Sequence, residues 1–369
     1  MGMNRRQLLS ALVLWIAGGA TIWAQSGINA YLYNPPADKY VEKYPYERPD
    51  EVTPLHASLD LVGTEAPEGP ATLSFRIEGS KGTLHVGEIR VSSLNGSFHT
   101  QIDLPRLMPE AGQITWMLKP ENGTAINGQT ILHWVRFHGH ILYRSGQPHS
   151  TYISLRPYGW HEPGEIVAPV QEDGSFDLQI PARVYRVMNI NGCGYLYDAM
   201  ERWGWDLDLT RDREEDFTIG RTEIYGVRAF NLSDVPHTIY ILFRPSSLSR
   251  IRSYLADEKG IPGKAERATM IEATKKSPTV VGPELTAQNV KLWLNDAPLD
   301  MLSLTPVIEH DAGGILQINY LAQCMLPKDF QSRFGERSRI RIEVLSREML
   351  HGKTYEDFGQ SSIDVKWPL

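Results

Sequence analysis

Aromatic side chains flanked by carboxylates are the residues of this sequence best suited to binding a ligand. They fall in two long segments between predicted strands, Tyr158–Gln171 and Asn191–Asp216. Exposed rings beside acids and amides can stack on sugars, and the same groups serve contacts with other proteins. Equally, such rings can pack as a small core under long loops. The predicted ligand-binding residues are Tyr158, Trp160, His161, Tyr195, Tyr197, Trp203, Trp205 and Asp206.

Strand direction is what would bring these two segments together. Short runs of alternating apolar and polar residues predict strands on either side of both segments. If consecutive strands run antiparallel, the connection after the second strand, ending near Pro157, leaves from the same end of the sandwich as the connection after the fourth, ending near Ile190. The sequence therefore predicts one aromatic site at that end.

The elements around this site are predicted to be strands almost throughout. Alternating runs separated by turn residues extend over most of the chain, with one amphipathic helical stretch that Ser246 or Ser247 can cap and Gly260 can end. We predict an all-β protein of tandem antiparallel β-sandwich domains, Ig-like or transthyretin-like, with a short helical connector. The predicted divisions are a signal peptide at 1–24, an extended linker at 25–54, sandwiches at 55–125, 130–245 and 281–369, and the connector at 246–280.

The middle sandwich carries a pattern more specific than alternation. It reads Phe137-x-Gly139-x-Ile141, then Gly146-x-Pro148, then Asp173-Gly-Ser-Phe176-x-Leu-x-Ile180-Pro181. In this order the pattern resembles the carboxypeptidase regulatory-like domain, a member of the transthyretin-like and Cna-B-like β-sandwiches. The resemblance implies an accessory or binding module without peptidase activity, and it directs Phe137, Gly139 and Ile141 inward.

Two histidines of that pattern, His138 and His140, share the opposite face of their strand. With His133 or His149 as a third ligand they could hold a metal. Because the resemblance turns them outward and no carboxylate motif lies near, we predict no metal and no cofactor. A metal-dependent hydrolase using His138 and His140 stays open as an alternative.

Other chemistry lacks its usual spacing. The sequence has no nucleophile elbow, no phosphate-binding Gly-rich loop and no zinc-protease helix. The acidic stretch 206–216 departs from a calcium loop, since Arg211 stands where the turn glycine belongs and Phe217 at the final ligand position. We therefore predict that the protein is not an enzyme.

The N-terminus predicts export. Arg5 and Arg6 precede an apolar run from Leu8 to Ala24, the pattern of a signal peptide cleaved after Ala24, by either the general or the twin-arginine route. Losing these two arginines takes the formal net charge from −7 to −9. A mildly acidic chain without basic clusters argues against nucleic acid and, after cleavage, against membrane as a partner.

The predicted function follows from these features together. We predict an exported, extracytoplasmic, non-catalytic binding or adhesion module, with a glycan or a surface protein as its partner. A structural or assembly protein of the cell surface is the main alternative. The sequence leaves open the oligomeric state, and spacing alone does not show whether Cys193 and Cys324 pair.

Overall fold

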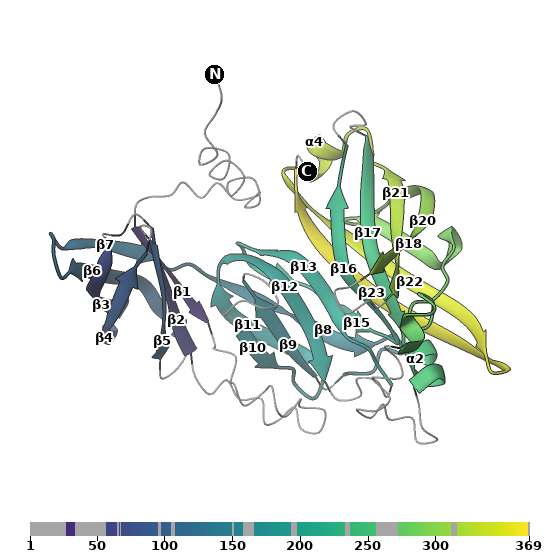
Figure 1. The fold of residues 1–369 in the computed structure, drawn as a ribbon, viewed down its shortest axis with the longest axis horizontal. Coiled ribbons are helices and arrows are strands. Elements are labelled where there is room, and N and C mark those ends of the chain that lie inside the picture. The colour runs from purple at the N-terminus through teal and green to yellow at the C-terminus, as the bar shows by residue number, and fades with distance from the viewer. Residues whose placement is uncertain are drawn as a thin grey trace. The chain divides into compact units, whose positions relative to one another are not determined.

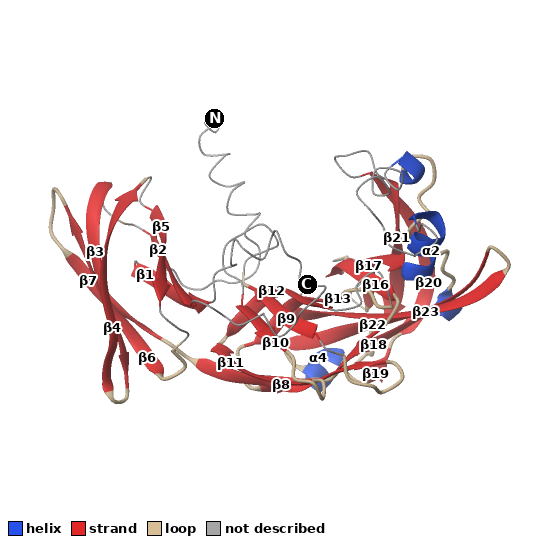
Figure 2. Cartoon of the chain, turned by 90° about the horizontal axis from the view of Figure 1, so that it is seen from below, coloured by secondary structure: helices blue, strands red, loops and turns tan. Residues whose placement is uncertain are grey.

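The fold is all-β, as the sequence predicts (Figures 1 and 2). In the computed structural model of the chain, the residues described are 27–33, 57–64, 66, 68–94, 97–104, 108–149, 151–157, 166–192, 198–232, 237–255, 272–310 and 316–367. They fall into two compact units, the first holding strands β1 to β7 and the second holding β8 to β23.

The first unit contains two sheets. One has the order β1-β2-β5, with β1 at Gly27–Tyr33, β2 at Ala57–Thr64 and β5 at Ser97–Leu104. The other has the order β4-β3-β6-β7, with β3 at Gly69–Gly79, β4 at Gly82–Ser93, β6 at Ala111–Pro120 and β7 at Ile126–Ile131. Leu73, Phe75 and Ile77 are buried while Arg76 between them is exposed, the period of two that a strand requires.

Strand β1 lies in the segment for which the sequence analysis expected an extended linker. Its residues Gly27–Tyr33 pair with β2. The reason is local composition, because the prolines that rule out a regular strand begin only at Pro35, after the aromatic and β-branched residues of this run.

The second unit is built on one eight-stranded sheet and two smaller sheets. The large sheet has the order β10-β9-β12-β13-β23-β22-β18-β19. Its strands are β9 at Thr151–Arg156, β10 at Ile166–Pro169, β12 at Arg183–Gly192, β13 at Arg202–Leu209, β18 at Val290–Leu294, β19 at Ala297–Pro298, β22 at Arg337–Leu350 and β23 at Lys353–Lys366.

Each small sheet belongs to one half of this unit, where the first half holds β8 to β15 and the second half holds β16 to β23. The first has the order β11-β8-β14 with β15 also on β8, and comprises β8 at Trp134–Tyr143, β11 at Ser175–Pro181, β14 at Arg213–Glu214 and β15 at Phe217–Ile219. The second has the order β16-β17-β21-β20, and comprises β16 at Thr222–Phe230, β17 at Thr238–Ser247, β20 at Asp300–His310 and β21 at Leu316–Met325.

The large sheet crosses the boundary predicted between the middle and C-terminal sandwiches. β13 pairs in parallel with β23, placing Trp203 opposite Ser361 and Trp205 opposite Ile363. Moreover β17, expected in the middle domain, pairs with β21 of the C-terminal half. The two halves therefore form one compact unit. Local alternation could not indicate this, because pairing partners so far apart in sequence leave no periodic signal.

The core of the first half gathers around three phenylalanines. The ring of Phe137 lies 5.0 Å from Phe176 and 6.1 Å from Phe217 between centroids, and all three side chains are buried. Gly139 and Ile141 are buried with them, while His140 is exposed, so the predicted inward and outward positions of β8 are confirmed.

Helix α2, Leu248–Leu255, matches the predicted start of the helical connector. Ser247 Oγ accepts a hydrogen bond from Arg250 N at 3.2 Å, so the predicted cap is confirmed. Leu248 and Ile251 are buried, whereas Gly260 lies outside the described residues. Residues 272–274 are helical as well, and the shorter helices η3 and α4 lie at Ala287–Asn289 and Phe330–Phe334.

Two sequence-based predictions concern the ends of the chain and its thiols. The predicted signal peptide, 1–24, and Cys193 lie outside the described residues. Cys324 is a free, buried thiol, and burial raises its pKa to about 12. Among the helices that are described, none has the length and apolar character needed to cross a membrane.

Candidate functional site

The predicted aromatic site divides between described and undescribed residues. Tyr158, Trp160, His161, Tyr195 and Tyr197 lie outside the part of the chain that the structure describes. Trp203, Trp205 and Asp206 are described, and they lie in strand β13 instead of in a loop. Their run has the alternation of a strand, with Leu207 and Leu209 also buried, and this was the signal that could have placed them.

The strand ends from which the two predicted loops depart do not lie together. Because β10 is an additional strand between β9 and β11, β12 is the fifth strand of this half and not the fourth. It runs antiparallel to β9, with Gly192 opposite Thr151 and Val187 opposite Arg156. The C-terminal ends of β9 and β12 are therefore at opposite ends of the pair, contrary to the argument that joined the two loops.

Trp203 and Trp205 pack within the second unit. Their rings stack with centroids 5.6 Å apart and planes 12° from parallel, and Trp203 is only 7% exposed. Trp203 Nε1 donates a hydrogen bond to Glu223 Oε1 at 2.9 Å, and the Arg228 guanidinium lies 5.4 Å from the centre of the Trp205 ring. For Trp203 this corresponds to the alternative in which the ring packs inside the protein.

Asp206 is engaged by neighbouring residues. Its backbone is left-handed, with φ of 49°, a conformation that aspartate tolerates better than most residues. Its Oδ1 lies 2.6 Å from Arg186 Nη1. Burial raises the pKa of Asp206, although Arg186 and Arg228 act to lower it.

Two glutamates lie beside Trp203, the buried Glu223 and the partly buried Glu201, and neither was predicted from the sequence. Burial, and then the charge of Glu201, raise the pKa of Glu223 well above its ordinary value. Burial raises the pKa of Glu201 to about 7, against the opposing effects of a hydrogen bond with Asn189 and of the Arg156 charge. Glu201 also accepts a hydrogen bond from Asn191 Nδ2. An acid at a buried position of the strand run Thr222–Phe230 was the available signal for Glu223.

The histidines considered as metal ligands have separate surroundings. His138 lies opposite Asp177 of β11. His140 Nδ1 lies 3.1 Å from Asp216 Oδ1. His149 is buried against the Tyr143 ring, 4.5 Å between centroids, and burial lowers its pKa. Among the residues described, no three or more His, Cys, Asp or Glu side chains are grouped to hold a metal ion.

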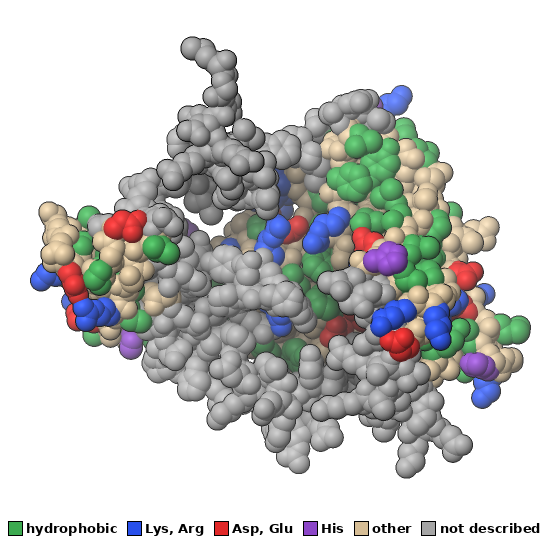
Figure 3. Space-filling model, in the orientation of Figure 1, with side chains coloured by type: hydrophobic (Ala, Val, Ile, Leu, Met, Phe, Trp, Pro, Cys, Tyr) green, Lys and Arg blue, Asp and Glu red, His purple; other side chains and the backbone are tan. Residues whose placement is uncertain are grey.

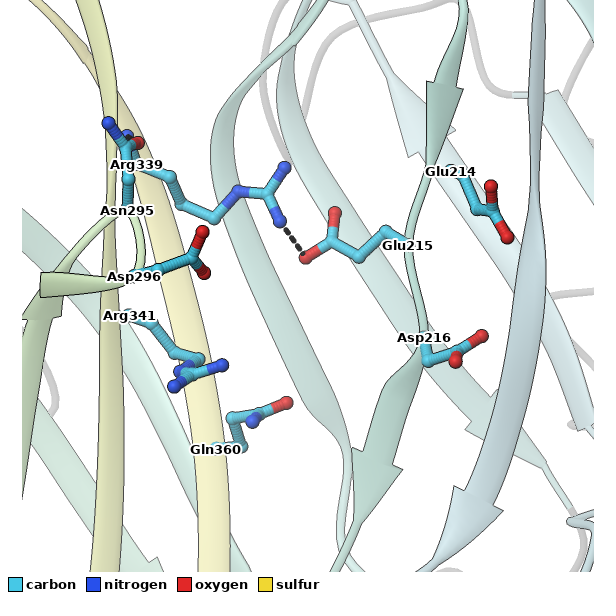
Figure 4. A pocket seen from close by; sticks show the side chains of 8 residues that line it. All are labelled: Glu214, Glu215, Asp216, Asn295, Asp296, Arg339, Arg341 and Gln360. Carbon is cyan, nitrogen blue, oxygen red and sulfur yellow. Dashed lines mark hydrogen bonds and ion pairs between the residues drawn. The ribbon is translucent and has the colours of Figure 1, made fainter. Parts of the chain in front are cut away.

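A polar cleft of about 380 Å³ opens elsewhere in the second unit (Figure 4). One wall is the segment from β14 to β15, and the other consists of β22, β23 and the β18–β19 turn. Figure 4 shows the Glu215 side chain directed toward Arg339 across the cleft, at 2.7 Å between Oε1 and Nη1, and Glu214 and Asp216 turned away. The lining residues are Glu214, Glu215, Asp216, Asn295, Asp296, Arg339, Arg341 and Gln360.

Of the two arginines that line this cleft, Arg341 has the longer ion pair with a carboxylate. Its guanidinium carbon lies 4.3 Å from the centre of the Trp293 ring, and its Nε lies 3.8 Å from Glu343 Oε1. Gln360 Nε2 donates to the same Glu343 oxygen at 3.2 Å, which leaves Gln360 Oε1 as a further polar atom at the cleft. The cleft thus offers hydrogen-bond donors and acceptors, and the Arg341 guanidinium itself covers the Trp293 ring.

An ion-pair network holds Glu215, one of the residues that line the cleft. Glu215 Oε2 lies 2.8 Å from Arg213 Nη2, and Arg213 also pairs with Asp364 of β23, all three side chains being nine-tenths buried. Burial acts to lower the pKa of Arg213, but the two carboxylates outweigh it and the pKa is raised. For Arg339 and Arg341 of the cleft, the charges that alternate with isoleucine in the β22 run Arg339-Ile-Arg-Ile-Glu343 were the sequence signal.

No family model matches the chain, and no curated protein is similar to it. Solved structures give distant likenesses. The major pilin subunit BcpA of Bacillus cereus is 10% identical, with 52% of this chain and 69% of that chain covered and a TM-score of 0.17. A marsupial T cell receptor is 10% identical over 92% of this chain and all of its own, with a TM-score of 0.15. A tetra-tandem repeat from the extending region of a large adhesion protein is 11% identical, over 92% of this chain and 74% of its own, also at 0.15. Likenesses at this level transfer no function to the chain.

Proposed function

We propose that this protein is an exported, non-catalytic structural or adhesion module, in which residues 133–367 act as one rigid β body. The observation that carries the proposal is the parallel pairing of β13 with β23, which continues one sheet through both halves of the second unit. Two sandwiches joined by a flexible linker would bend under load, whereas a shared sheet must lose backbone hydrogen bonds before its halves separate.

Side chains across the same junction reinforce it. Arg213 of β14 pairs with Asp364 of β23, and Ser361 Oγ donates to the Trp203 carbonyl oxygen at 2.9 Å. Arg202, 2% exposed, donates to Ser362 Oγ at 3.2 Å. The charged and hydroxyl side chains near the junction therefore pair with groups of the other half and hold the two halves together. This supports a structural role over a catalytic one.

We also assign the first half of this unit to the carboxypeptidase regulatory-like sandwiches. The burial of Phe137, Ile141 and Phe176 supports the register that the resemblance implies. Tyr185 Oη donates to the Pro181 carbonyl oxygen at 2.9 Å, a tyrosine-to-backbone contact of the kind that fixes corners in β-sandwiches.

Cell fractionation combined with in-cell cross-linking tests the proposed function. We expect a mature protein outside the cytoplasm, with an N-terminus near Gln25, cross-linked to other surface components without any added small ligand. Replacing Arg5 and Arg6 by lysine should block export only if the twin-arginine route is used. A full-length product confined to the cytoplasm would contradict the proposal.

The polar cleft supports a second candidate, the binding of a glycan. Its charged and amide groups suit the hydroxyl groups of a sugar. Arg341→Ala should lower the affinity for a glycan found by array screening about tenfold or more, roughly 1.4 kcal/mol. Arg347→Ala, on the same strand but 71% exposed and paired with Glu356, is the matched control and should leave affinity unchanged. If both changes lowered the affinity equally, the cleft would be excluded as the glycan-binding site.

A further inference from the structure

The polar cleft opens on the face of the large sheet that lies away from the core of the second half. The isoleucines of β22 are buried in that core, and Arg339 and Arg341 alternate with them. Because neighbouring residues of a strand point to opposite faces, both arginines point away from the core and line the cleft. On the other side of the same core, hydrophobic side chains gather over β16 and β17 (Figure 3). The second half therefore has surfaces of different chemistry, and the cleft lies on a polar one.

Four arginines gather around two buried carboxylates beside this cleft. Arg202 is 2% exposed, and burial lowers its pKa to about 10 against the opposing charge of Glu215. The charges of three neighbouring arginines lower this pKa further, and these are Arg339, Arg213 and Arg341. Two buried carboxylates, Glu215 and Asp364, lie among the four guanidinium groups and cannot balance all of their charge. Positive charge in a partly enclosed site favours an anionic ligand.

The two buried carboxylates pair with two of these arginines. Glu215 lies 2.8 Å from Arg213 and 2.7 Å from Arg339 between the paired atoms. Asp364 pairs with the same two side chains. Of the four arginines, Arg339 and Arg341 line the cleft. Arg341 is therefore the arginine that faces the cleft without a close carboxylate.

The Arg341 guanidinium retains unpaired donors. Its ion pair is with Glu343, at 3.8 Å from Nε, which is too long for a hydrogen bond. Nε is buried without a hydrogen-bond partner, and among the residues described no group accepts a hydrogen bond from the rest of the guanidinium. The Trp293 ring, 4.3 Å from the guanidinium carbon, holds the group in place by its face. The N–H groups at the edge of the guanidinium therefore remain as donors for a ligand.

Asp296 is the carboxylate of the cleft that opposes an anion there. Of the other carboxylates that line the cleft, Glu214 and Asp216 are turned away and Glu215 is paired (Figure 4). Asp296 is exposed and has no ion pair with the residues described. In Figure 4 the Arg341 side chain lies between those of Asp296 and Gln360. Gln360 presents its Oε1 as an acceptor, because its Nε2 donates to Glu343.

We propose that the cleft binds a sugar that carries a carboxylate, a uronic acid, through Arg341. Two parallel hydrogen bonds from the guanidinium to the carboxylate satisfy the unpaired donors, and such charge-assisted pairs are stronger than neutral ones. Gln360 accepts from a hydroxyl group of the same sugar. The cleft, of about 380 Å³, has room for a sugar ring. The inference rests on glycan binding, the second candidate function above, and names the class of glycan.

Oligosaccharides with and without their carboxylates test this inference. Oligosaccharides of glucuronic, galacturonic and mannuronic acid are titrated into the purified exported chain, each beside the same oligosaccharide with its carboxylates reduced to alcohols. At least one acidic form should bind about tenfold or more tightly than its reduced form. Arg341→Ala should remove that difference. Arg347→Ala should preserve it, because Arg347 is 71% exposed and pairs with Glu356 outside the cleft.

Asp296→Asn is a second variant, and it should act in the opposite direction. It removes the negative charge that faces the ligand, so the acidic form should bind about threefold more tightly and the reduced form as before. Because Asp296 is exposed, this change leaves the fold intact. Unchanged melting temperatures of the variants show that the altered affinities belong to the site.

Three results would overturn the inference and leave glycan binding standing. These are equal binding of the two forms in every pair, a preference for the acidic form that survives Arg341→Ala, and an Asp296→Asn variant that binds the acidic form no more tightly than the wild type. If no oligosaccharide of either form binds, glycan binding at the cleft is wrong as well. The structural role is tested separately, by fractionation and cross-linking.

Discussion

Phe176 illustrates how single residues hold the first half of the second unit together. Its ring is 3% exposed and contacts the rings of Phe137 and Phe217, at 5.0 and 6.0 Å between centroids. Phe176→Ala should lower the free energy of unfolding by about 3 to 5 kcal/mol, because it removes buried ring surface and leaves a cavity. Denaturant titration measures this loss, with the exposed Met349→Ala as control. A loss below about 1 kcal/mol would place Phe176 outside the core.

The glutamates beside Trp203 predict a pH dependence of stability. Burial raises the pKa of Glu201 to about 7, whereas an exposed glutamate in the unfolded chain titrates near 4.3. Between these values the folded state holds a proton on this group that the unfolded chain has lost. Its contribution to stability is therefore fully present below the unfolded pKa and is lost as pH rises through the folded pKa. For Glu201 the loss is about 4 kcal/mol, and the raised pKa of Glu223 acts in the same direction.

Replacing one of these carboxyls tests that dependence. Glu223→Gln should make the protein more stable than the wild type at pH 8 and flatten the fall in unfolding free energy between pH 5 and pH 8. Glu356→Gln is the control, because the pKa of Glu356 is lowered by Arg347 and Arg144 and this group is fully ionised throughout that range. If the unfolding free energy of the wild-type protein rose between pH 5 and pH 8, this would contradict the raised pKa values of Glu201 and Glu223.

At the scale of elements, Asp357 of β23 anchors the start of helix α2. Its side chain is 2% exposed and accepts hydrogen bonds from Ser247 Oγ at 2.6 Å, Ser249 N at 2.9 Å and Arg221 Nε at 2.9 Å. Asp357→Ala should cost about 3 to 5 kcal/mol, because it leaves these donors without their acceptor. The adjacent, exposed Glu356→Ala should cost less than about 1 kcal/mol. Equal losses, measured by denaturant titration, would show that the anchor contributes nothing.

Elements set by local pattern were predictable from the sequence, and elements set by distant pairing were not. The alternation around Phe137 and the cap at Ser247 are readable within a few residues, and both are confirmed. Strand β10 was missed because its four residues lie in a Pro- and Gly-rich segment. Missing it reversed the direction assigned to β12 and so brought together two loops whose strand ends are apart.

The polar cleft shows the same limit for the candidate site. Glu215, Arg339 and Gln360 come from three separate runs of the sequence. The runs of Arg339 and Gln360 pair with each other as β22 and β23, and the distant pairing of β13 with β23 joins them to the half of the unit that contains Glu215. Each run alone reads as a charged, solvated strand face. The aromatic segments had the stronger local signal, yet Trp203 is used for packing.

At the scale of the molecule, the account depends on the second unit behaving as one body. The shared sheet, the Arg213–Asp364 pair and the Arg202 contacts all cross the junction between its halves. A body of this kind opens globally instead of half by half, since separation of either half breaks the same backbone ladder. Two independent sandwiches would instead each unfold with a free energy of its own.

Native-state hydrogen exchange of the full chain over a denaturant series tests this claim most directly. Backbone amides of β12 in the first half and of β21 in the second are the informative probes. As denaturant increases, the account predicts that both sets merge into a single unfolding transition with one free energy and one denaturant dependence. Two transitions with different free energies, one for each half, would contradict it and return the protein to two sandwiches in series.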